Sequence, residues 1–506
     1  MTETKDKKAH SVYLLLLILI LITPVMQIAV ALALNGKSIY DFIPDWIDEL
    51  QWWCQADAVS RYGRPLGYWG WDGGTAQIGT FAFWGPAMVM PYGLFAFLFG
   101  WKWYSWIFAN LFYTTIANMV FIRLTKINTK GLFWLFIANQ LLFVKDYYLF
   151  TSMQETVRWS LGIVAIGLIV YLYRNRNMKW WTRYLLVPLY LIYITQAYLI
   201  WALFMLFYFL IVFDDLVGAN KHDIYSIFYK IGGGIITFLV YVYLSRKLLG
   251  MLSSPFPHSA GSIKNNFFMM KKFIYHSGTP KFFFIWFFTS YIELMLYTSV
   301  FALFNAKRLD NQEKWIYIAA AITLLSFFAG HLVLYADVST WTLVRGMCGG
   351  LVIAVFLLAI AKHRQGIVLF IVCAIAGFPT LSEINPVFFD NNRFVSERLK
   401  NNAAANANLW ESMIGYAEEH TAANKDNPWD YTVATYRTEG TDFILTVLPG
   451  YSVNIMSNGA VSHNARYSVI GKVYNPDAAN ISMRLTDAGF IKVYEDNRIV
   501  GFVNPK

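Results

Sequence analysis

The chain has 506 residues, of which 57% are hydrophobic and only 14% are charged, and its formal net charge is +10. Soluble domains carry about a quarter charged residues, so this composition excludes an ordinary soluble protein and indicates a polytopic membrane protein. The positive charge needs no nucleic acid, because Lys and Arg on cytoplasmic loops orient membrane helices and no basic run here is typical of nucleic-acid binding.

The first membrane segment is predicted at 12–34, directly after a start that contains Lys5, Lys7 and Lys8. A charged start followed by an apolar run is also the pattern of a signal peptide, but this run is longer than a typical signal core and lacks a clean processing site. We therefore expect a retained first helix that acts as a signal anchor.

Later apolar runs predict further spans and bring the total to about eleven helices. The run at 184–213 is too long for one span and is divided near Gln196 into two short ones. The run at 367–378 is short for a span. The other predicted spans are 103–124, 132–150, 157–173, 227–244, 282–304, 316–336 and 343–361.

Basic residues between the spans orient the chain. They fall on the same side as the N-terminal lysines, which the positive-inside rule assigns to the cytoplasm. An odd number of helices then places the C-terminus outside, together with the loop after the first span. The orienting residues are Arg123, Lys126, Lys130, Arg174, Arg176, Lys179, Arg183, Lys307, Arg308, Lys362 and Arg364.

The apolar segment 81–100 is not counted as a span. Gly85, Pro86, Pro91 and Gly93 interrupt it, and glycine and proline at this density disfavour a straight membrane helix. We expect one or two short helices that lie at the outer interface. As a span, the segment would move every later basic loop to the outside.

The composition becomes polar after Phe378, which predicts a small extracytoplasmic α/β domain at 381–506 beside a transmembrane domain at 1–380. The overall fold class is therefore mainly α. Expected strands lie at 431–436, 443–447, 467–473, 491–495 and 499–503, and expected helices at 405–421 and 477–488.

The outer loop at 35–80 combines acids and aromatic residues. Carboxylates can supply a general base, and flat aromatic faces suit sugar rings. The alternative is an interface loop whose aromatic residues form a belt and whose acids face water. The acids are Asp41, Asp45, Asp48, Glu49, Asp57 and Asp72, and the aromatic residues include Trp52, Trp53, Tyr68, Trp69 and Trp71.

Other ionisable residues interrupt or flank apolar runs. Asp146 and Glu155 flank the next outer turn with Lys145 and Arg158, either as functional groups or as structural ion pairs. Arg345, near the outer end of its predicted helix, could grip a phosphate or snorkel at the interface. The outer loop at 246–281 is either a lid that contacts an anionic lipid-linked substrate or a loop in water or lipid headgroups, and its lysines are Lys264, Lys271 and Lys272.

Several common chemistries have no motif here. The sequence contains no phosphate-binding GxxxxGK[ST] loop, no HExxH and no GxSxG, so neither an ATP-driven pump nor a common hydrolase is supported. Cys54, Cys348 and Cys373 form no CxxC pair, so we expect neither a disulfide framework nor a zinc site.

Short motifs along most of the chain resemble the GT-C superfamily of membrane glycosyltransferases, in particular bacterial members that use polyprenyl-phosphate sugars. Many relatives have His where Trp84 stands, so no histidine role is carried over to that position. The motifs are Asp48-Glu49, Gly63-Arg64-Pro65-Leu66-Gly67-Tyr68, Trp84-Gly85-Pro86, Pro91-Tyr92-Gly93-Leu94, Phe99-Gly100-Trp101, Ser152-Met153-Gln154-Glu155, Asn427-Pro428-Trp429-Asp430-Tyr431, Arg466-Tyr467-Ser468-Val469 and Val493-Tyr494-Glu495-Asp496.

The resemblance implies a GT-C-like helical fold and an inverting hexosyl- or pentosyltransferase. It would act on the outer face of the cell membrane, from a polyprenyl-phosphate-sugar donor to a cell-surface glycan, lipid or protein. Asp48 is expected as the base, with Glu49 beside it. The resemblance identifies no definite cofactor, and Mg²⁺ or Mn²⁺ stays open, with Asp48, Asp146 and Glu155 as ligands. Expected substrate-binding residues are Asp146, Glu155, Arg158, Lys271, Lys272, Arg345, Trp52 and Tyr68.

Two other functions remain open. A transporter or flippase of a lipid-linked saccharide would use the same acids and aromatic residues without forming a bond, although the chain lacks the internal repeats typical of transporters. A membrane protein whose outer domain binds a partner would need no membrane site at all.

Overall fold

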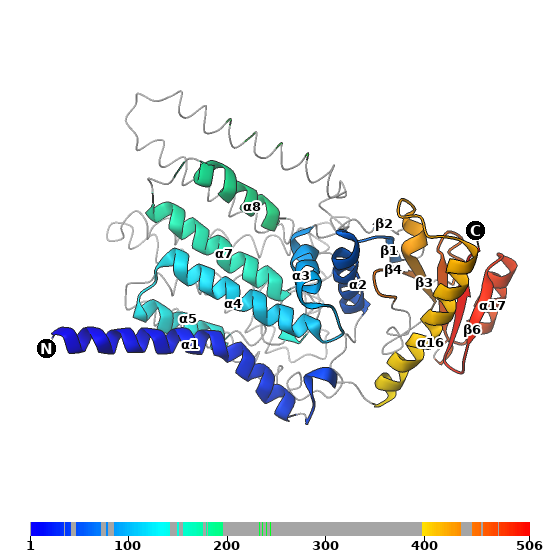
Figure 1. The fold of residues 1–506 in the computed structure, drawn as a ribbon, viewed down its shortest axis with the longest axis horizontal. Coiled ribbons are helices and arrows are strands. Elements are labelled where there is room, and N and C mark those ends of the chain that lie inside the picture. The colour runs from blue at the N-terminus through cyan, green and yellow to red at the C-terminus, as the bar shows by residue number, and fades with distance from the viewer. Residues whose placement is uncertain are drawn as a thin grey trace, which may run out of the picture.

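The structure is a computed structural model of the chain (Figure 1). It describes residues 2–34, 36–41, 47–71, 77–78, 86–141, 149–150, 155–175, 179, 181–195, 232, 235, 239, 243, 397–436, 448–456, 459–473 and 475–505. The predicted spans at 282–304, 316–336, 343–361 and 367–378 lie outside these residues, so the total of about eleven helices stays a prediction.

The described N-terminal helices lie roughly side by side (Figure 1). These helices coincide with apolar runs of the sequence. A helix with apolar residues all round must be covered by lipid or by other helices. Gly167 lets α7 approach α4 closely, because a Cβ there would lie 3.3 Å from Phe121 Cα. The helices are α1 (Thr2–Leu34), α4 (Ser105–Thr125), α5 (Thr129–Leu141), α7 (Glu155–Arg174) and α8 (Val187–Thr195), the last preceded by a π-helical turn, η2 (Thr182–Leu186).

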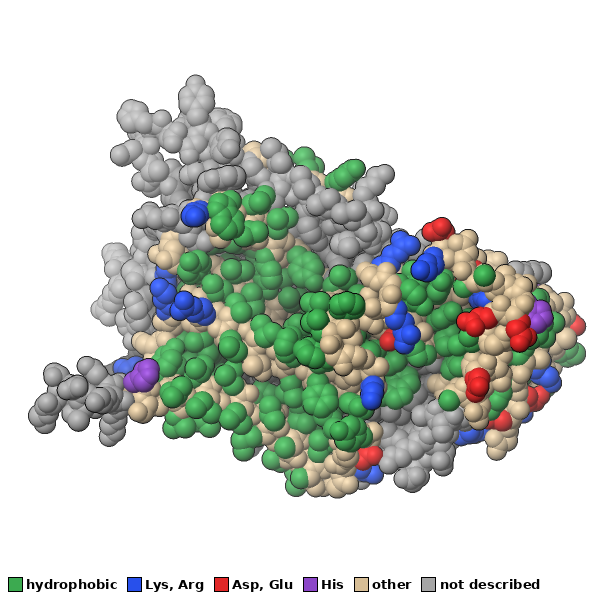
Figure 2. Space-filling view, in the orientation of Figure 1, with side chains coloured by type: hydrophobic (Ala, Val, Ile, Leu, Met, Phe, Trp, Pro, Cys, Tyr) green, Lys and Arg blue, Asp and Glu red, His purple; other side chains and the backbone are tan. Residues whose placement is uncertain are grey.

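Among the described residues, His10–Leu34 and Ser105–Thr125 are long and apolar enough to cross a membrane. In the first of these, only 22% of the most apolar window is buried within the protein. Such a surface needs an apolar solvent, which fits a helix in contact with lipid. Figure 2 shows apolar side chains over the helical part, while acidic side chains gather mainly over the C-terminal part.

The segment after α1 contains more regular structure than its sequence predicts. It contains a 3₁₀ turn, η1 (Ile39–Asp41), a helix, α2 (Ile47–Tyr62), and two short strands, β1 (Tyr68–Trp71) and β2 (Gln77–Ile78). The expected interfacial segment forms one helix, α3 (Pro86–Phe99), which has only 14 residues. Proline fits its first turn, and Gly100 follows its end with φ +81°.

The C-terminal part is an α/β structure with a seven-stranded sheet in the order β2-β1-β4-β3-β5-β7-β6. Four strands coincide with predicted runs: β3 (Thr432–Tyr436), β5 (Tyr467–Gly471), β6 (Ile491–Glu495) and β7 (Ile499–Val503). The strand β4 (Ser452–Met456) was not predicted, and the predicted strand at 443–447 lies outside the described residues. Because β1 and β2 join this sheet, the domain boundary at 380 stays a prediction.

Two helices cover the sheet (Figure 1). α16 (Glu397–His420) packs on one face, against Val433, Val469 and Val503. α17 (Ala478–Asp487) packs on the other, against Ala434 and Ile470. The two sets alternate along the strands, as the two-residue period of a pleated sheet requires. Both faces are therefore buried, which explains why β3, β4, β5 and β7 contain no exposed residue.

We expect Gly93→Ala to lower the apparent melting temperature, because its Cβ would collide with Val59 where α3 crosses α2. Overpacking of this kind costs about 1–3 kcal/mol. Gly415→Ala is the matched control, since Gly415 is also helical but has nothing within 4 Å of its Cβ position. That change should raise stability by about 0.5–1 kcal/mol. Thermal unfolding in detergent measures both, and equal shifts would contradict the close approach of α2 and α3.

Candidate functional site

The helix α2 is buried on all sides although its sequence is only partly apolar. No residue from Glu49 to Val59 is more than 8% exposed. Buried polar residues need partners or a function, because an unpaired buried polar group costs free energy. The polar residues in this buried stretch are Glu49, Gln51, Gln55 and Asp57.

The apolar side of α2 joins a cluster that includes Tyr92 of α3, Trp106 of α4 and Val157 of α7. The ring of Trp53 stacks on that of Trp103 with centroids 4.2 Å apart. Trp53 Nε1 also donates to the Lys102 carbonyl at 3.2 Å, and Trp101 Nε1 donates to the Trp53 carbonyl at 3.0 Å. These contacts fix the first half of α2 against the turn that enters α4.

The other side of α2 carries amides. Positions 48, 51, 55 and 62 lie along one face of the helix, since residues three, four and seven apart share a face. The side chains of Gln51 and Gln55 are buried, and neither Oε1 atom accepts a hydrogen bond from any residue that the structure describes. Two neighbouring buried acceptors without donors suit a ligand rich in hydroxyl or N–H groups.

Asp57 is satisfied within the helix. Arg61 Nε donates to Asp57 Oδ2 at 2.6 Å, one turn away. Burial raises the pKa of the Asp57 carboxyl, and the Arg61 guanidinium opposes that rise. This pair accounts for the carboxylate of Asp57 as a structural group near the C-terminal end of α2.

The N-terminal turn of α7 contributes to the same apolar cluster as α2. Val157 belongs to the same apolar cluster as Leu50 and Trp53. The chain just before α7 is held by α4, because Asn110 Nδ2 donates to the Leu149 carbonyl at 3.1 Å. Asn110 Oδ1 in turn accepts from Tyr92 Oη at 2.6 Å. The first half of α2 and the first turn of α7 thus contribute to one apolar cluster, and both segments contain predicted site residues.

The structure describes the side chains of only some of the predicted site residues. Glu49 is buried in the first turn of α2, and Arg158 is half-buried in the first turn of α7. Trp52 is buried in the cluster described above rather than presented as an open face, and its contact with sugar stays a prediction.

For other predicted site residues, the structure describes only the backbone, or they lie outside the described residues altogether. Asp48 is the second residue of α2, Glu155 the first of α7 and Tyr68 the first of β1, and their side chains are outside the description. Asp146, Lys271, Lys272 and Arg345 lie outside the described residues. The described part of the chain contains no group of three His, Cys, Asp or Glu side chains that could hold a metal ion.

Sequence reasoning missed Gln51, Gln55 and Asn110. Gln51 and Gln55 are four residues apart among tryptophans, and that spacing on a helix was the available signal. The signal was not used because the segment was interpreted as a loop. Asn110 lies inside a predicted span, where an amide usually links helices.

We expect Gln51→Leu and Gln55→Leu to raise the apparent melting temperature. An unsatisfied buried acceptor costs about 1–3 kcal/mol, and leucine removes it at similar size. Asn110→Leu is the contrasting control, because Asn110 is a buried amide that is bonded at both ends. It should lower the melting temperature by leaving Tyr92 Oη and the Leu149 carbonyl without this partner. If the Gln variants lost as much stability as Asn110→Leu, the amides of α2 would have protein partners.

No protein-family model and no curated protein sequence matches the chain. Its fold is similar to that of ArnT from Cupriavidus metallidurans bound to undecaprenyl phosphate, with a TM-score of 0.42, 10% identity, and coverage of 95% of this chain and 97% of that one. The apo state of ArnT gives a TM-score of 0.40 with the same identity and coverage.

The fold is also similar to that of the Archaeoglobus fulgidus oligosaccharyltransferase in complex with Zn and sulfate. The TM-score is 0.43 at 12% identity, with coverage of 95% of this chain and 73% of that one.

Proposed function

We propose that this protein is a membrane glycosyltransferase of the GT-C kind. It transfers a sugar from a polyprenyl-phosphate-linked donor to an acceptor on the extracytoplasmic face, with inversion. The observation that supports this most directly is the buried helix α2, which contains the acidic pair in its first turn and shares an apolar cluster with the first turn of α7. The motif Asp48-Glu49 falls in α2, and the motif at 152–155 ends at the first residue of α7.

In this reaction Asp48 acts as the general base. Its carboxylate takes the proton of the acceptor hydroxyl, whose oxygen attacks the anomeric carbon of the donor. The bond between that carbon and the phosphate oxygen breaks, and its electron pair leaves with the lipid phosphate. A base must lie within about 2.6–3.2 Å of the proton donor, so the position of α2 relative to the acceptor decides the rate. Glu49, buried beside it, supports the base or binds substrate.

The leaving phosphate needs positive charge. Arg158 lies in the first turn of α7, and a guanidinium can bind a phosphate through two hydrogen bonds. Lys271, Lys272 and Arg345 are further candidates for this role. The N-terminus of α7 adds the positive end of the helix dipole, which favours an anion at the same end of the helix.

The acceptor side of the site is assigned to the amide face of α2. Gln51 and Gln55 offer buried carbonyl oxygens that lack donors among the described residues. Sugar hydroxyls are donors of the required kind, and an unmade hydrogen bond that a substrate completes contributes to specificity. Trp52, Tyr68, Asp146 and Glu155 complete the proposed substrate-binding set.

A divalent metal would find carboxylates of suitable chemistry at Asp48, Asp146 and Glu155, since Mg²⁺ and Mn²⁺ prefer oxygen ligands. Such an ion would stabilise negative charge on the leaving phosphate. The described residues supply no complete ligand set by themselves.

We expect Asp48→Asn to reduce kcat by about 10²–10⁴-fold, the usual contribution of a positioned base. Asp41→Asn is the matched control, since Asp41 lies in the same outer loop and caps the backbone N–H of Ser38 at 2.9 Å. The assay follows the transfer of labelled sugar from a polyprenyl-phosphate donor by purified protein. Full activity in Asp48→Asn at normal expression would remove Asp48 from the reaction, and transport without a new glycosidic bond would contradict the proposal.

We expect Arg158→Ala to raise the KM for the lipid-phosphate donor about tenfold or more, because a charged hydrogen-bond partner contributes roughly 1.5–3 kcal/mol. Arg345→Ala should act in the same direction. Arg123→Ala is the control, since Arg123 is an exposed arginine at the other end of α4. Initial rates at varied donor concentration measure the effect, and an unchanged donor KM would remove the substituted arginine from the site.

A further inference from the structure

The edge of the C-terminal sheet is made by the outer loop that contains α2. Gly70 and Trp71 of β1 pair in parallel with Asn454 and Ile455 of β4. The strand β2 then pairs antiparallel with β1. Figure 1 shows these two strands beside β4 and close to the C-terminal end of α2. Hydrogen-bonded strands are a stiff connection, so the loop and the sheet form one unit at this point.

A close backbone approach reinforces the pairing. Gly67, directly before β1, has φ +88°, and a Cβ at this position would overlap with Ser452 Oγ and with the Tyr431 carbonyl. Only glycine fits both the left-handed backbone and the missing space. The chain that leaves α2 therefore rests directly on the backbone of the C-terminal part.

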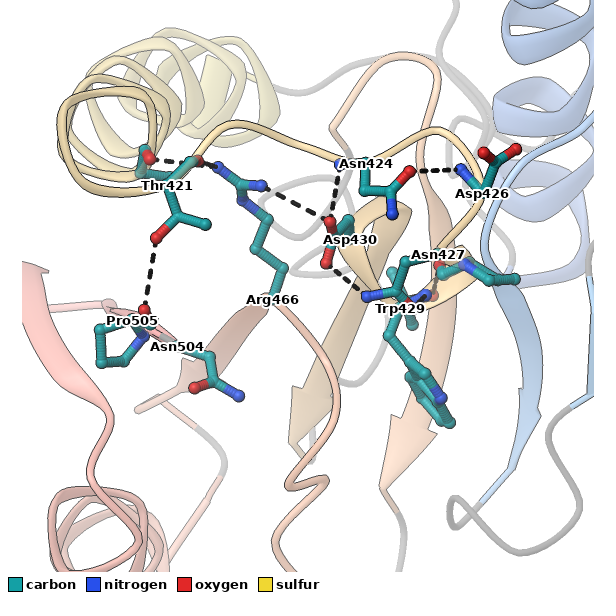
Figure 3. A network of polar contacts seen from close by, with 12 residues as sticks. Thr421, Asn424, Asp426, Asn427, Trp429, Asp430, Arg466, Asn504 and Pro505 are labelled. Atoms are coloured by element: carbon teal, nitrogen blue, oxygen red, sulfur yellow. Dashed lines mark hydrogen bonds and ion pairs between the residues drawn. The ribbon is translucent and has the colours of Figure 1, made fainter.

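The surface that receives Gly67 is itself fixed, as Figure 3 shows. Asp430, next to Tyr431, accepts hydrogen bonds from the Asn424 N–H and from Asn427 Nδ2, both at 2.8 Å. Arg466 is buried, lies 4.0 Å from the Asp430 carboxylate and donates to the Ala417 carbonyl at 3.1 Å. A network of this kind holds the turn η5 (Pro428–Tyr431) in one position.

The last turn of α2 makes a second contact with the C-terminal part. The ring of Tyr62 meets that of Tyr431 edge to face, with centroids 5.6 Å apart. Gly450, with φ +81°, passes so close to α2 that a Cβ would lie 3.1 Å from Arg61 Cδ and from Tyr62 Cε2. Aromatic contacts continue from Tyr431 through Tyr451 and Tyr467 to α16.

The first half of α2 is connected to the same body by a different route. Trp103, which stacks on Trp53, packs both on the apolar cluster of α2 and on the cluster of α16 and the sheet. The first half and the last turn of the helix are thus both connected to the C-terminal part. A helix of 16 residues is about 24 Å long, so a tilt at one end displaces the other.

We propose that the C-terminal α/β part positions α2 for catalysis, with Gly67 and Gly450 as positioning residues, and contributes no reacting group. This inference depends on the proposed function for its catalytic meaning. Loosening the junction shifts the first turn of α2, and a misplacement of about 1 Å can reduce a rate about 10²-fold. Substrate binding, which involves further segments, changes less.

The test compares two pairs of glycines. Gly67→Ala is matched by Gly63→Ala, and Gly450→Ala by Gly489→Ala. All four residues have φ between +75° and +90°, but the Cβ positions of Gly63 and Gly489 have nothing within 4 Å. Each pair therefore shares the backbone strain, about 1–2 kcal/mol, and differs in the collision at the junction. Gly450→Ala is the milder junction variant, because it displaces only side-chain atoms.

Two measurements are made on the full-length protein. Sugar transfer should show kcat about tenfold or more lower in each junction variant than in its control, with donor KM within about threefold. Hydrogen exchange should show faster exchange of the α2 amides in the junction variants only. If Gly67→Ala fails to fold, the comparison of Gly450→Ala with Gly489→Ala tests the proposal by itself.

The outcomes separate the two proposals. Equal kcat and equal α2 exchange within both pairs, with active wild-type protein, would overturn the positioning role. A higher donor KM with unchanged kcat in the junction variants would also overturn it. Wild-type protein that transfers no sugar from any polyprenyl-phosphate donor would refute the proposed function. In that case faster α2 exchange in the junction variants would still support the mechanical coupling.

Discussion

The candidate site depends on the burial of α2, a helix whose polar residues would not by themselves leave water. Its apolar side gains enough contact with α3, α4 and α7 to offset the burial of Glu49, Gln51, Gln55 and Asp57. The ion pair with Arg61 offsets the cost of burying the Asp57 carboxylate. The Oε1 atoms of Gln51 and Gln55, in contrast, accept no hydrogen bond from the described residues. The fold thus retains polar groups where an apolar helix would be more stable, and such positions are where function is expected.

Much of the helical part could be predicted, because long apolar runs give helices with little help from distant residues. The runs at 12–34, 103–124 and 157–173 correspond closely to α1, α4 and α7. The strands β3, β5, β6 and β7 followed from their β-branched and aromatic residues in the same way. The local sequence of these elements is therefore enough to predict them.

The rest could not be predicted, because it depends on contacts between distant segments. α2 was interpreted as a loop, since its mixed sequence shows no clear apolar stripe and only packing decides its state. β1 is a strand because β4 receives it, and β4 itself is a short segment with polar Ser452 and Asn454. The sequence also does not reveal that position 67 requires glycine, because the requirement comes from the backbone of Tyr431.

The location of the acidic pair at the start of α2 sets two opposing effects on its charge. Burial disfavours a carboxylate, and Glu49 is 1% exposed. The positive end of the helix dipole at the first turn favours one, by about 0.3–1 kcal/mol at an exposed helix end and more where the surroundings are partly buried. A general base must be ionised before it accepts a proton. A helix start can supply this stabilisation without water, whereas an extended loop has no aligned dipoles to offer. The same argument explains why the far end of α2 must be held firmly. In the proposed reaction, the helix N-terminus stabilises the charge at a fixed location, and anchoring the other end of α2 keeps that location constant relative to the substrate.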